Sequence, residues 1–234
     1  GFVNSGSGNA MDIGVYGLYW TSTEAGGNVA WYRDFRTSSS DRCRYHDNKL
    51  IKMSARCISD EIQNVTINVP QDFPTIQGAI DYAIDGDIIN VSAGTYYENI
   101  NFNGKNISVI GEDNKTTIID GSGDTVVSFV NGESNQSEIS SFTITNGGGD
   151  HGGGIWCDFS SSPIINNCII TNNAVDLDGG GINIYRNSNP IIKYCLIYSN
   201  SSNGGGGIYI WSESSPSIIN CTIVNNSAFG FQEG

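Results

Sequence analysis

Four large aromatic residues occupy matching places in a repeated part of the chain and are the first candidates for binding chemistry. Aromatic rings present flat apolar faces, which suit the C–H face of a sugar ring, while polar neighbours suit its hydroxyl groups. Loops, residues 1–60 or a second chain could instead cover such a contiguous patch. The sequence predicts a carbohydrate- or surface-binding face made of Trp156, Asp158, Asn183, Tyr185, Arg186, Tyr209 and Trp211.

Three aspartates of the same region are candidates for binding a cation. Asp150, Asp176 and Asp178 lie just before glycine runs in successive repeats. Oxygen ligands from adjacent turns suit Ca²⁺, so a calcium site is one hypothesis, and no other cofactor is expected. Aspartate before glycine also forms turns without any ion, which is the simpler alternative. His151 has no second His or Cys facing it, so we predict no transition-metal site there.

The cysteines divide into two groups. Cys168, Cys195 and Cys221 recur with the repeat, and we expect them to be small buried residues on adjacent layers. Cys43 and Cys57 lie close together in sequence on expected neighbouring strands and are a possible disulfide. That bond would imply an oxidising compartment.

The elements that would position these residues come from a repeat of 26–27 residues. Each copy begins with a glycine run followed by isoleucine (Ile155, Ile182, Ile208), continues to a proline and reaches the recurring cysteine. A fixed period of this length is typical of a stacked solenoid, in which each unit buries the apolar face of its neighbour.

Within each copy the residues alternate with a period of two, which indicates short strands rather than helices. Turn-forming Asn, Ser, Gly and Asp separate these strands. We therefore predict an all-β, right-handed parallel β-helix in which the three isoleucines form one interior ladder and the three cysteines another. The same alternation places Trp156, Asn183 and Tyr209 outside, followed by an outer row of Asp158, Tyr185 and Trp211. Asparagines 172, 173, 200, 225 and 226 are expected to stack as amide ladders at a corner.

Residues 61–86 read as a linker strand and a capping helix, and residues 87–234 as the β-helix. Ile67–Val69 forms the expected strand, and an amphipathic helix is predicted near residues 75–85. Asp72 or Thr75 suits its N-cap and Gly86 its C-cap. The repeat still continues at Asn226, so we expect further coils to follow and the given chain to be truncated at this end.

Residues 1–60 show no repeat, and their aromatic and arginine clusters resemble a known domain. The segments Gly17–Glu24, Ala30–Tyr32 and Ser54–Ile58 are similar to the end of the Fibrobacter succinogenes major paralogous domain. That family has a C-type-lectin-like fold and occurs on secreted and surface proteins. The resemblance covers the last part of such a domain and departs from it at Lys52-Met53. It implies a partial lectin-like segment, against the alternative of a small irregular β cap.

Residues 67–226 resemble the pectin-lyase-like right-handed β-helix superfamily, through the helix, the following strands and the later repeats. The superfamily includes polysaccharide lyases, hydrolases and esterases, so an enzyme acting on acidic glycans is an alternative. Gly94–Glu98 resembles a Gly-x-Tyr-x-Glu motif of pectin methylesterases, where the motif is structural. The catalytic motifs of the esterases and polygalacturonases have no match here, and lyases need a basic residue. We therefore assign no catalytic residue.

The excess of acidic over basic residues limits the kinds of molecule that the protein is expected to bind. The 234 residues contain 11 Lys and Arg against 24 Asp and Glu, and only four of the basic residues follow residue 60. An acidic surface repels phosphate backbones, so nucleic acid is not expected as a partner. No apolar run reaches the roughly 20 residues of a membrane span. We predict a secreted or cell-surface scaffold that binds glycans or surfaces; a further alternative is a structural subunit that assembles end to end through its uncapped end.

Overall fold

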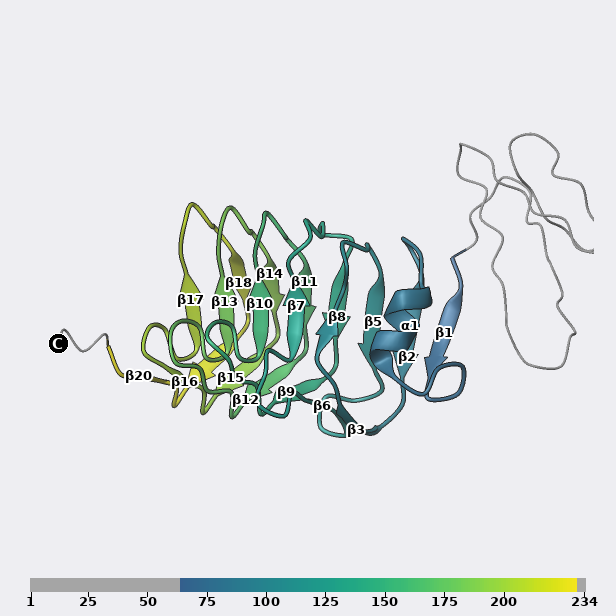
Figure 1. The fold of residues 1–234 in the computed structure, drawn as a ribbon, viewed down its shortest axis with the longest axis horizontal. Helices are drawn as coiled ribbons and strands as arrows, with labels where there is room; N and C mark the ends of the chain where they lie inside the picture. The colour runs from purple at the N-terminus through teal and green to yellow at the C-terminus, as the bar shows by residue number, and fades with distance from the viewer. Residues whose placement is uncertain (1–63, 231–234) are drawn as a thin grey trace, which may run out of the picture. The chain divides into compact units, whose positions relative to one another are not determined.

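The computed structural model describes residues 64–230. The chain divides into two compact units, Gly1–Gln63 and Asn64–Gly234. The predicted domain boundary after residue 60, the lectin-like segment and the Cys43–Cys57 pair concern the first unit, which lies outside the described residues. The second unit is a stack of coils with one helix, drawn in Figure 1.

The second unit contains twenty short strands and a single helix in its described part. The helix α1 is Ile76–Tyr82. The strands are β1 Thr66–Val69, β2 Ile88–Val91, β3 Gly94–Tyr97, β4 Ile100–Asn101, β5 Ser108–Gly111, β6 Thr117–Asp120, β7 Val127–Phe129, β8 Glu138–Ser140, β9 Thr143–Thr145, β10 Ile155–Cys157, β11 Ile164–Asn166, β12 Ile169–Thr171, β13 Ile182–Ile184, β14 Ile191–Lys193, β15 Leu196–Tyr198, β16 Ser201–Ser202, β17 Ile208–Ile210, β18 Ser217–Ile219, β19 Thr222–Val224 and β20 Ser227–Ala228.

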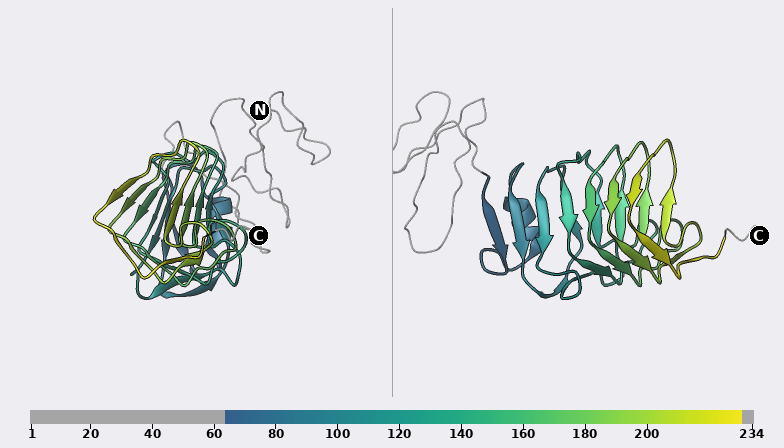
Figure 2. Two further views of the ribbon diagram at one scale, coloured as in Figure 1. Left: turned by 90° about the vertical axis from the view of Figure 1, so that its left-hand side faces the viewer. Right: turned by 180° about the vertical axis from the view of Figure 1, so that it is seen from behind.

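The strands form three long parallel sheets, and successive coils superpose in the left view of Figure 2, which looks along the stack. The seven-stranded sheet runs β1-β2-β5-β8-β11-β14-β18, the six-stranded sheet β19-β15-β12-β9-β6-β3, and the five-stranded sheet β17-β13-β10-β7-β4; β16 and β20 pair separately. Each strand pairs with its counterpart in the next coil, one repeat along the chain. The predicted parallel solenoid is therefore confirmed.

The interior ladders have the predicted register. Ile155 pairs with Ile182, which pairs with Ile208, and Ile170 pairs with Ile197. Ile155 and Ile182 are fully buried, and Cys168 and Cys195 are buried free thiols. Phe142 occupies the position of the cysteine one coil earlier, and it is also buried. These aliphatic, thiol and aromatic side chains form one continuous core.

The glycine runs allow neighbouring coils to approach closely. A Cβ on Gly154 would lie 2.5 Å from the carbonyl oxygen of Gly181, and one on Gly181 would lie 2.4 Å from that of Gly207. Real Cβ atoms do not come so close to backbone atoms, so only glycine fits at this turn. The glycines therefore set the stacking of the loops that lead into β10, β13 and β17.

One asparagine ladder stands at a corner of the coil, as predicted, but with fewer members. Asn173 donates from Nδ2 to Asn200 Oδ1 at 2.9 Å, and Asn200 donates likewise to Asn226 at 2.9 Å. Asn172 and Asn225 do not join this ladder. Their backbones are left-handed, with φ of 55° and 54°, and their exposed side chains occupy the bend itself. Asparagine tolerates this conformation better than most residues, which explains its presence there.

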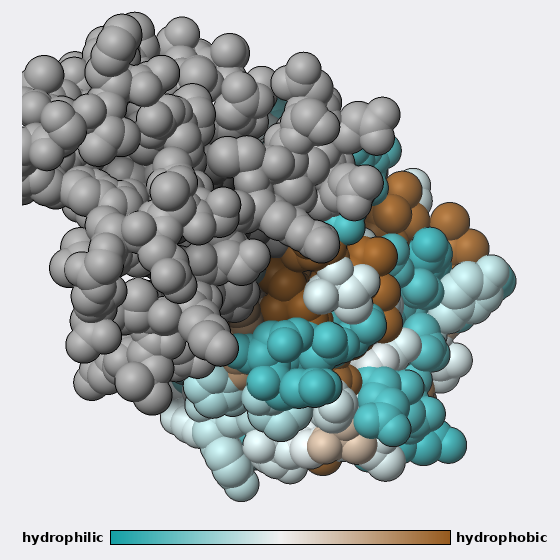
Figure 3. All heavy atoms as spheres, turned by 90° about the vertical axis from the view of Figure 1, so that its right-hand side faces the viewer, coloured by the Kyte–Doolittle hydropathy of each residue, from teal (hydrophilic) through white to brown (hydrophobic). Residues whose placement is uncertain are grey.

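Helix α1 lies against β1, β2 and β4 and buries Ile76, Ala79 and Ile80. Thr75 is the N-cap, its side chain accepting from the Gly78 amide, while Ala83 rather than Gly86 is the C-cap. Glu98 accepts hydrogen bonds from the amides of Ile76 and Gln77, both at 2.9 Å. Its carboxylate thus satisfies two of the free N–H groups of the helix start. Figure 3 faces this end of the solenoid, where brown hydrophobic side chains lie among teal polar ones.

The last described coil leaves interior positions open. Ile218 and Ile223 continue the ladders of Ile192 and Ile197, yet they are 42% and 46% exposed. Cys221, predicted to be buried, is only partly buried for the same reason. Among residues 64–230, no later coil covers these side chains.

Candidate functional site

The five-stranded sheet carries the candidate site on the outer surface of β10, β13 and β17. Trp156 pairs with Asn183, and Asn183 pairs with Tyr209, so these residues form one column across three coils. The residues just after these strands form the second column, because the Tyr185 amide bonds to Cys157 and the Trp211 amide to Ile184. The register of the two predicted columns is therefore present, but Asn183 in the first column and Asp158 in the second are buried rather than exposed.

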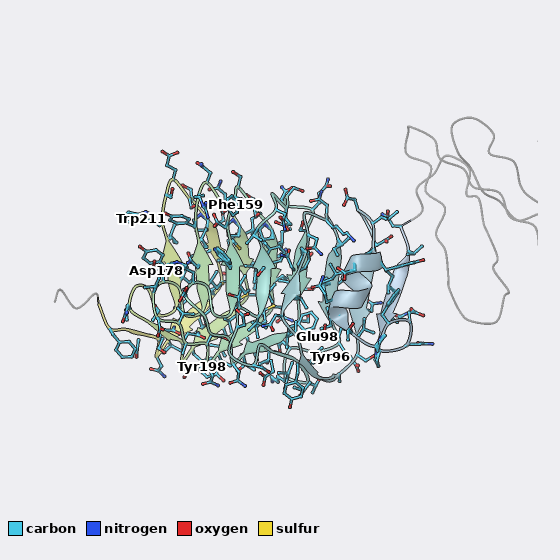
Figure 4. The ribbon with its side chains drawn as sticks, viewed as in Figure 1. Tyr96, Glu98, Phe159, Asp178, Tyr198 and Trp211 are labelled. Atoms are coloured by element: carbon cyan, nitrogen blue, oxygen red, sulfur yellow. The ribbon has the colours of Figure 1, made fainter. Side chains whose placement is uncertain are left out.

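The aromatic members of the two columns lie at the surface. Trp211 is 58% exposed, and Trp156, Tyr185 and Tyr209 are partly exposed. The rings of Tyr209 and Trp211 are nearly parallel, with centroids 6.3 Å apart and planes inclined by 14°. Figure 4 labels Trp211 beside β17, on the same side of the solenoid as Phe159 and Asp178. The two rings therefore offer adjacent, similarly oriented flat surfaces.

The alternation predicted that Asp158 faces solvent, but its side chain is fully buried. Arg186, from the next coil, donates to both carboxylate oxygens, from Nε at 2.8 Å and from Nη2 at 2.5 Å. The Phe159 amide adds a third hydrogen bond to Asp158 Oδ1 at 2.7 Å. A buried carboxylate needs such partners, because removing its charge from water is costly. Asp158 is therefore an anchor for Arg186 rather than a ligand-binding group.

Phe159 belongs to the site although the sequence reasoning did not select it. Its side chain is 51% exposed, and the Arg186 guanidinium lies over its ring, with Cζ 3.8 Å from the centroid. The same Cζ lies 5.3 Å from the centroid of the Tyr185 ring. Phe159 follows the strand in a left-handed turn with φ of 52°, where strand alternation no longer predicts direction. The sequence does contain a signal for the Asp158–Arg186 ion pair beside Phe159: the two residues carry opposite charges and stand one repeat plus one residue apart.

Asn183 was also expected outside, yet it is only 3% exposed. Its Nδ2 donates to the carbonyl oxygen of Asp178 at 3.3 Å, which holds the amide against the loop before β13. Its Oδ1, like Asp178 Oδ1, is buried and has no hydrogen-bond partner within residues 64–230. The polar element of the exposed face is therefore Arg186 and the Tyr209 hydroxyl, not Asn183.

The Tyr209 hydroxyl stays protonated, and so can donate a hydrogen bond, over a wide pH range. Partial burial, followed by the charges of Asp178 and Tyr185, raises its pKa above the usual value. Burial and nearby negative charge both disfavour the phenolate. Tyr209 can therefore donate a hydrogen bond at any physiological pH.

The three aspartates of the calcium hypothesis do not gather into one cluster of side chains. Asp150 and Asp176 are exposed, whereas the Asp178 side chain is 17% exposed and lies 3.7 Å from His151 Nδ1. Between residues 64 and 230 no three His, Cys, Asp or Glu side chains gather closely enough to hold a metal ion. Backbone bonds such as Leu177 N–H to Asp150 carbonyl instead tie these loops together. The turn-forming alternative fits their placement.

Comparison with known proteins identifies the fold family. Residues 85–233 match the family described as a right handed beta helix region. No curated protein matches the chain. Among the described residues no helix is long and apolar enough to cross a membrane. The matched segment contains every strand of the candidate site together with the ladders that position it, and the chain belongs to the family of right-handed β-helix regions.

Proposed function

We propose that this protein is a non-catalytic, secreted or cell-surface scaffold whose β-helix binds carbohydrate through the face of β10, β13 and β17. The observation that carries the proposal is the exposed, nearly parallel ring pair of Tyr209 and Trp211, extended by Tyr185, Phe159 and Arg186. Isolated exposed aromatics need no explanation, but a contiguous set does. Such rings bind the apolar faces of sugars, while the Tyr209 hydroxyl and Arg186 bind hydroxyl groups.

The resemblance of residues 67–226 to the pectin-lyase-like superfamily supports a polysaccharide as the ligand, and the lectin-like resemblance of residues 1–60 supports a surface location. Neither resemblance supplies a catalytic group. On the described face, Arg186 is the one basic side chain, and it is already paired with Asp158. Removal of a proton beside a sugar carboxylate needs an available base. We therefore favour binding over catalysis.

Loss of retention in two single variants tests the proposal. Trp211→Ala and Tyr185→Ala should each weaken retention on a glycan array at least about tenfold, which corresponds to about 1.4 kcal/mol. Tyr198→Ala is the matched control, because Tyr198 is a partly exposed aromatic residue on β15 of the six-stranded sheet. All three melting temperatures should stay close to that of the parent protein. Absence of binding by the parent protein on a broad array, or loss of stability in the two face variants, would show that this face is a packing surface.

A further inference from the structure

The charges around the aromatic face restrict the kind of glycan that it can accept. The described residues contain four Lys and Arg side chains, and three of them lie elsewhere. The described histidine, His151, has its Nδ1 3.7 Å from the Asp178 carboxylate. Lys193 is in β14 of the seven-stranded sheet, and Lys115 is in the turn before β6. Lys105 donates from Nζ to the carbonyl oxygens of Ile80 and Asp81 at the end of α1. Arg186 is therefore the one described Lys or Arg side chain at the face.

Arg186 is not available to neutralise an anionic ligand. Its Nε and Nη2 form a bidentate pair with Asp158, and the Asp158 carboxylate is fully buried. Release of Arg186 to a ligand carboxylate would leave a buried charge without its counter-ion, and breaking a buried pair in this way is strongly unfavourable. The net charge of the pair is zero.

The remaining charges near the face are negative. Glu213 is exposed and follows Trp211 by two residues. Asp178 and Tyr209 both lie beside Gly204, and the negative charge of Asp178 contributes to the raised pKa of Tyr209. Asp150 and Asp176 are exposed in the loops of the same coils. A polyuronate would meet these carboxylates with no free cation to offset them. A neutral sugar meets no such repulsion, because its hydroxyl groups need only hydrogen bonds.

We infer that the face formed by Trp156, Phe159, Tyr185, Tyr209 and Trp211 selects uncharged polysaccharides and rejects acidic ones. This inference rests on the proposed carbohydrate binding and specifies the ligand class. The rings of Tyr209 and Trp211 stack on the sugars. The Tyr209 hydroxyl and Arg186, whose pair with Asp158 uses only Nε and Nη2, donate to sugar oxygens.

Pairs of polysaccharides that differ only in charge provide the test. Polygalacturonan and alginate are compared with their carboxyl-reduced forms, in which each carboxylate has become a hydroxymethyl group, and neutral glucans, xylans and mannans complete the panel. The parent protein should bind at least one neutral polymer, prefer reduced over acidic forms at least tenfold, and show little change between 20 and 500 mM NaCl. Equal or tighter binding of the acidic forms would overturn the inference and leave carbohydrate binding standing. No binding to any polymer would overturn both.

Two charge variants separate the electrostatic argument from general affinity. Asp158→Asn keeps the shape and releases the charge of Arg186, so the ratio of acidic to neutral binding should rise at least threefold. Glu213→Lys places a cation at an exposed position and should raise the same ratio even if the first variant folds poorly. Glu138→Gln on β8 of the seven-stranded sheet changes the net charge as Asp158→Asn does, and the ratio should stay unchanged. An equal rise in this control, or no rise in either face variant, would contradict the assignment.

Discussion

The asparagine ladder gives the sharpest stability prediction, through the variant Asn200→Ala. Asn200 is 1% exposed, and its Nδ2 donates to Ile170 O, Tyr198 O and Asn226 Oδ1. Its Oδ1 accepts from the backbone and side-chain amides of Asn173. The substitution removes all five hydrogen bonds and leaves the Asn173 amide without this acceptor.

The expected cost follows from these contacts. A buried neutral hydrogen bond contributes about 1 kcal/mol net, and a buried donor left unpaired costs about 1–3 kcal/mol. Because the five bonds share one side chain and are not additive, we expect Asn200→Ala to lower the free energy of unfolding by about 3–5 kcal/mol. Asn172→Ala is the control at the neighbouring position, where the side chain is exposed and the backbone φ is 55°. Its cost should be about 1 kcal/mol, from the left-handed conformation alone.

Urea unfolding followed by both tryptophan fluorescence and far-ultraviolet circular dichroism measures the two costs. Coincident transitions by the two probes are required, since repeat proteins can unfold in parts. A cost below about 1 kcal/mol for Asn200→Ala, or one equal to that of Asn172→Ala, would show that the ladder does not stabilise the corner in the way argued.

Three further outcomes are expected. Glu98→Ala should lower the free energy of unfolding by about 1–2 kcal/mol, because the amides of Ile76 and Gln77 lose their acceptor, and hydrogen exchange at these two amides should quicken; unchanged exchange would refute the cap. Cys195→Ser should cost about 1–3 kcal/mol, and a thiol reagent should modify Cys221 before Cys168 and Cys195; equal rates for all three would contradict the burial. Burial raises the pKa of Cys157 in the folded protein, and a contact with Cys168 together with burial raises that of Cys195. Since the unfolded thiols ionise near pH 8.5, stability should be complete below that pH and fall above it by up to about 1.4 kcal/mol per pH unit for each thiol. Urea titrations at pH 8 and 10 measure this slope, which Cys157→Ala should reduce.

The ladders could be predicted from the sequence because successive side chains of a strand point to opposite faces. Once the interior isoleucine of a strand is known, the direction of its other side chains follows. Ile155, Ile182 and Cys168 were placed correctly by that argument, as was Thr75 as a possible helix cap. Capping and strand alternation are local properties, and the 26–27-residue repeat supplies the register between coils.

The site was less predictable because its details depend on contacts between coils and on turns. Asp158 lies just after β10, where an ion pair with Arg186 of the next coil draws it inside. Phe159 lies in a left-handed turn, and Asn183 is covered by its own loop. None of these three placements follows from alternation along a single strand, because each depends on how the turn of one coil packs against the turn of the next coil.

Nuclear magnetic resonance mapping of a bound neutral polysaccharide tests the central claim, the location of the binding face, most directly. The indole N–H signals of Trp156 and Trp211 and the ring signals of Tyr209 should shift on titration with the tightest neutral polymer. The methyl signals of Ile218 and Ile223, on the open coil, should remain unchanged because they lie outside the aromatic face. Shifts confined to those methyl groups, or binding that leaves both indoles unperturbed, would contradict the assignment of the face of β10, β13 and β17 as the carbohydrate site.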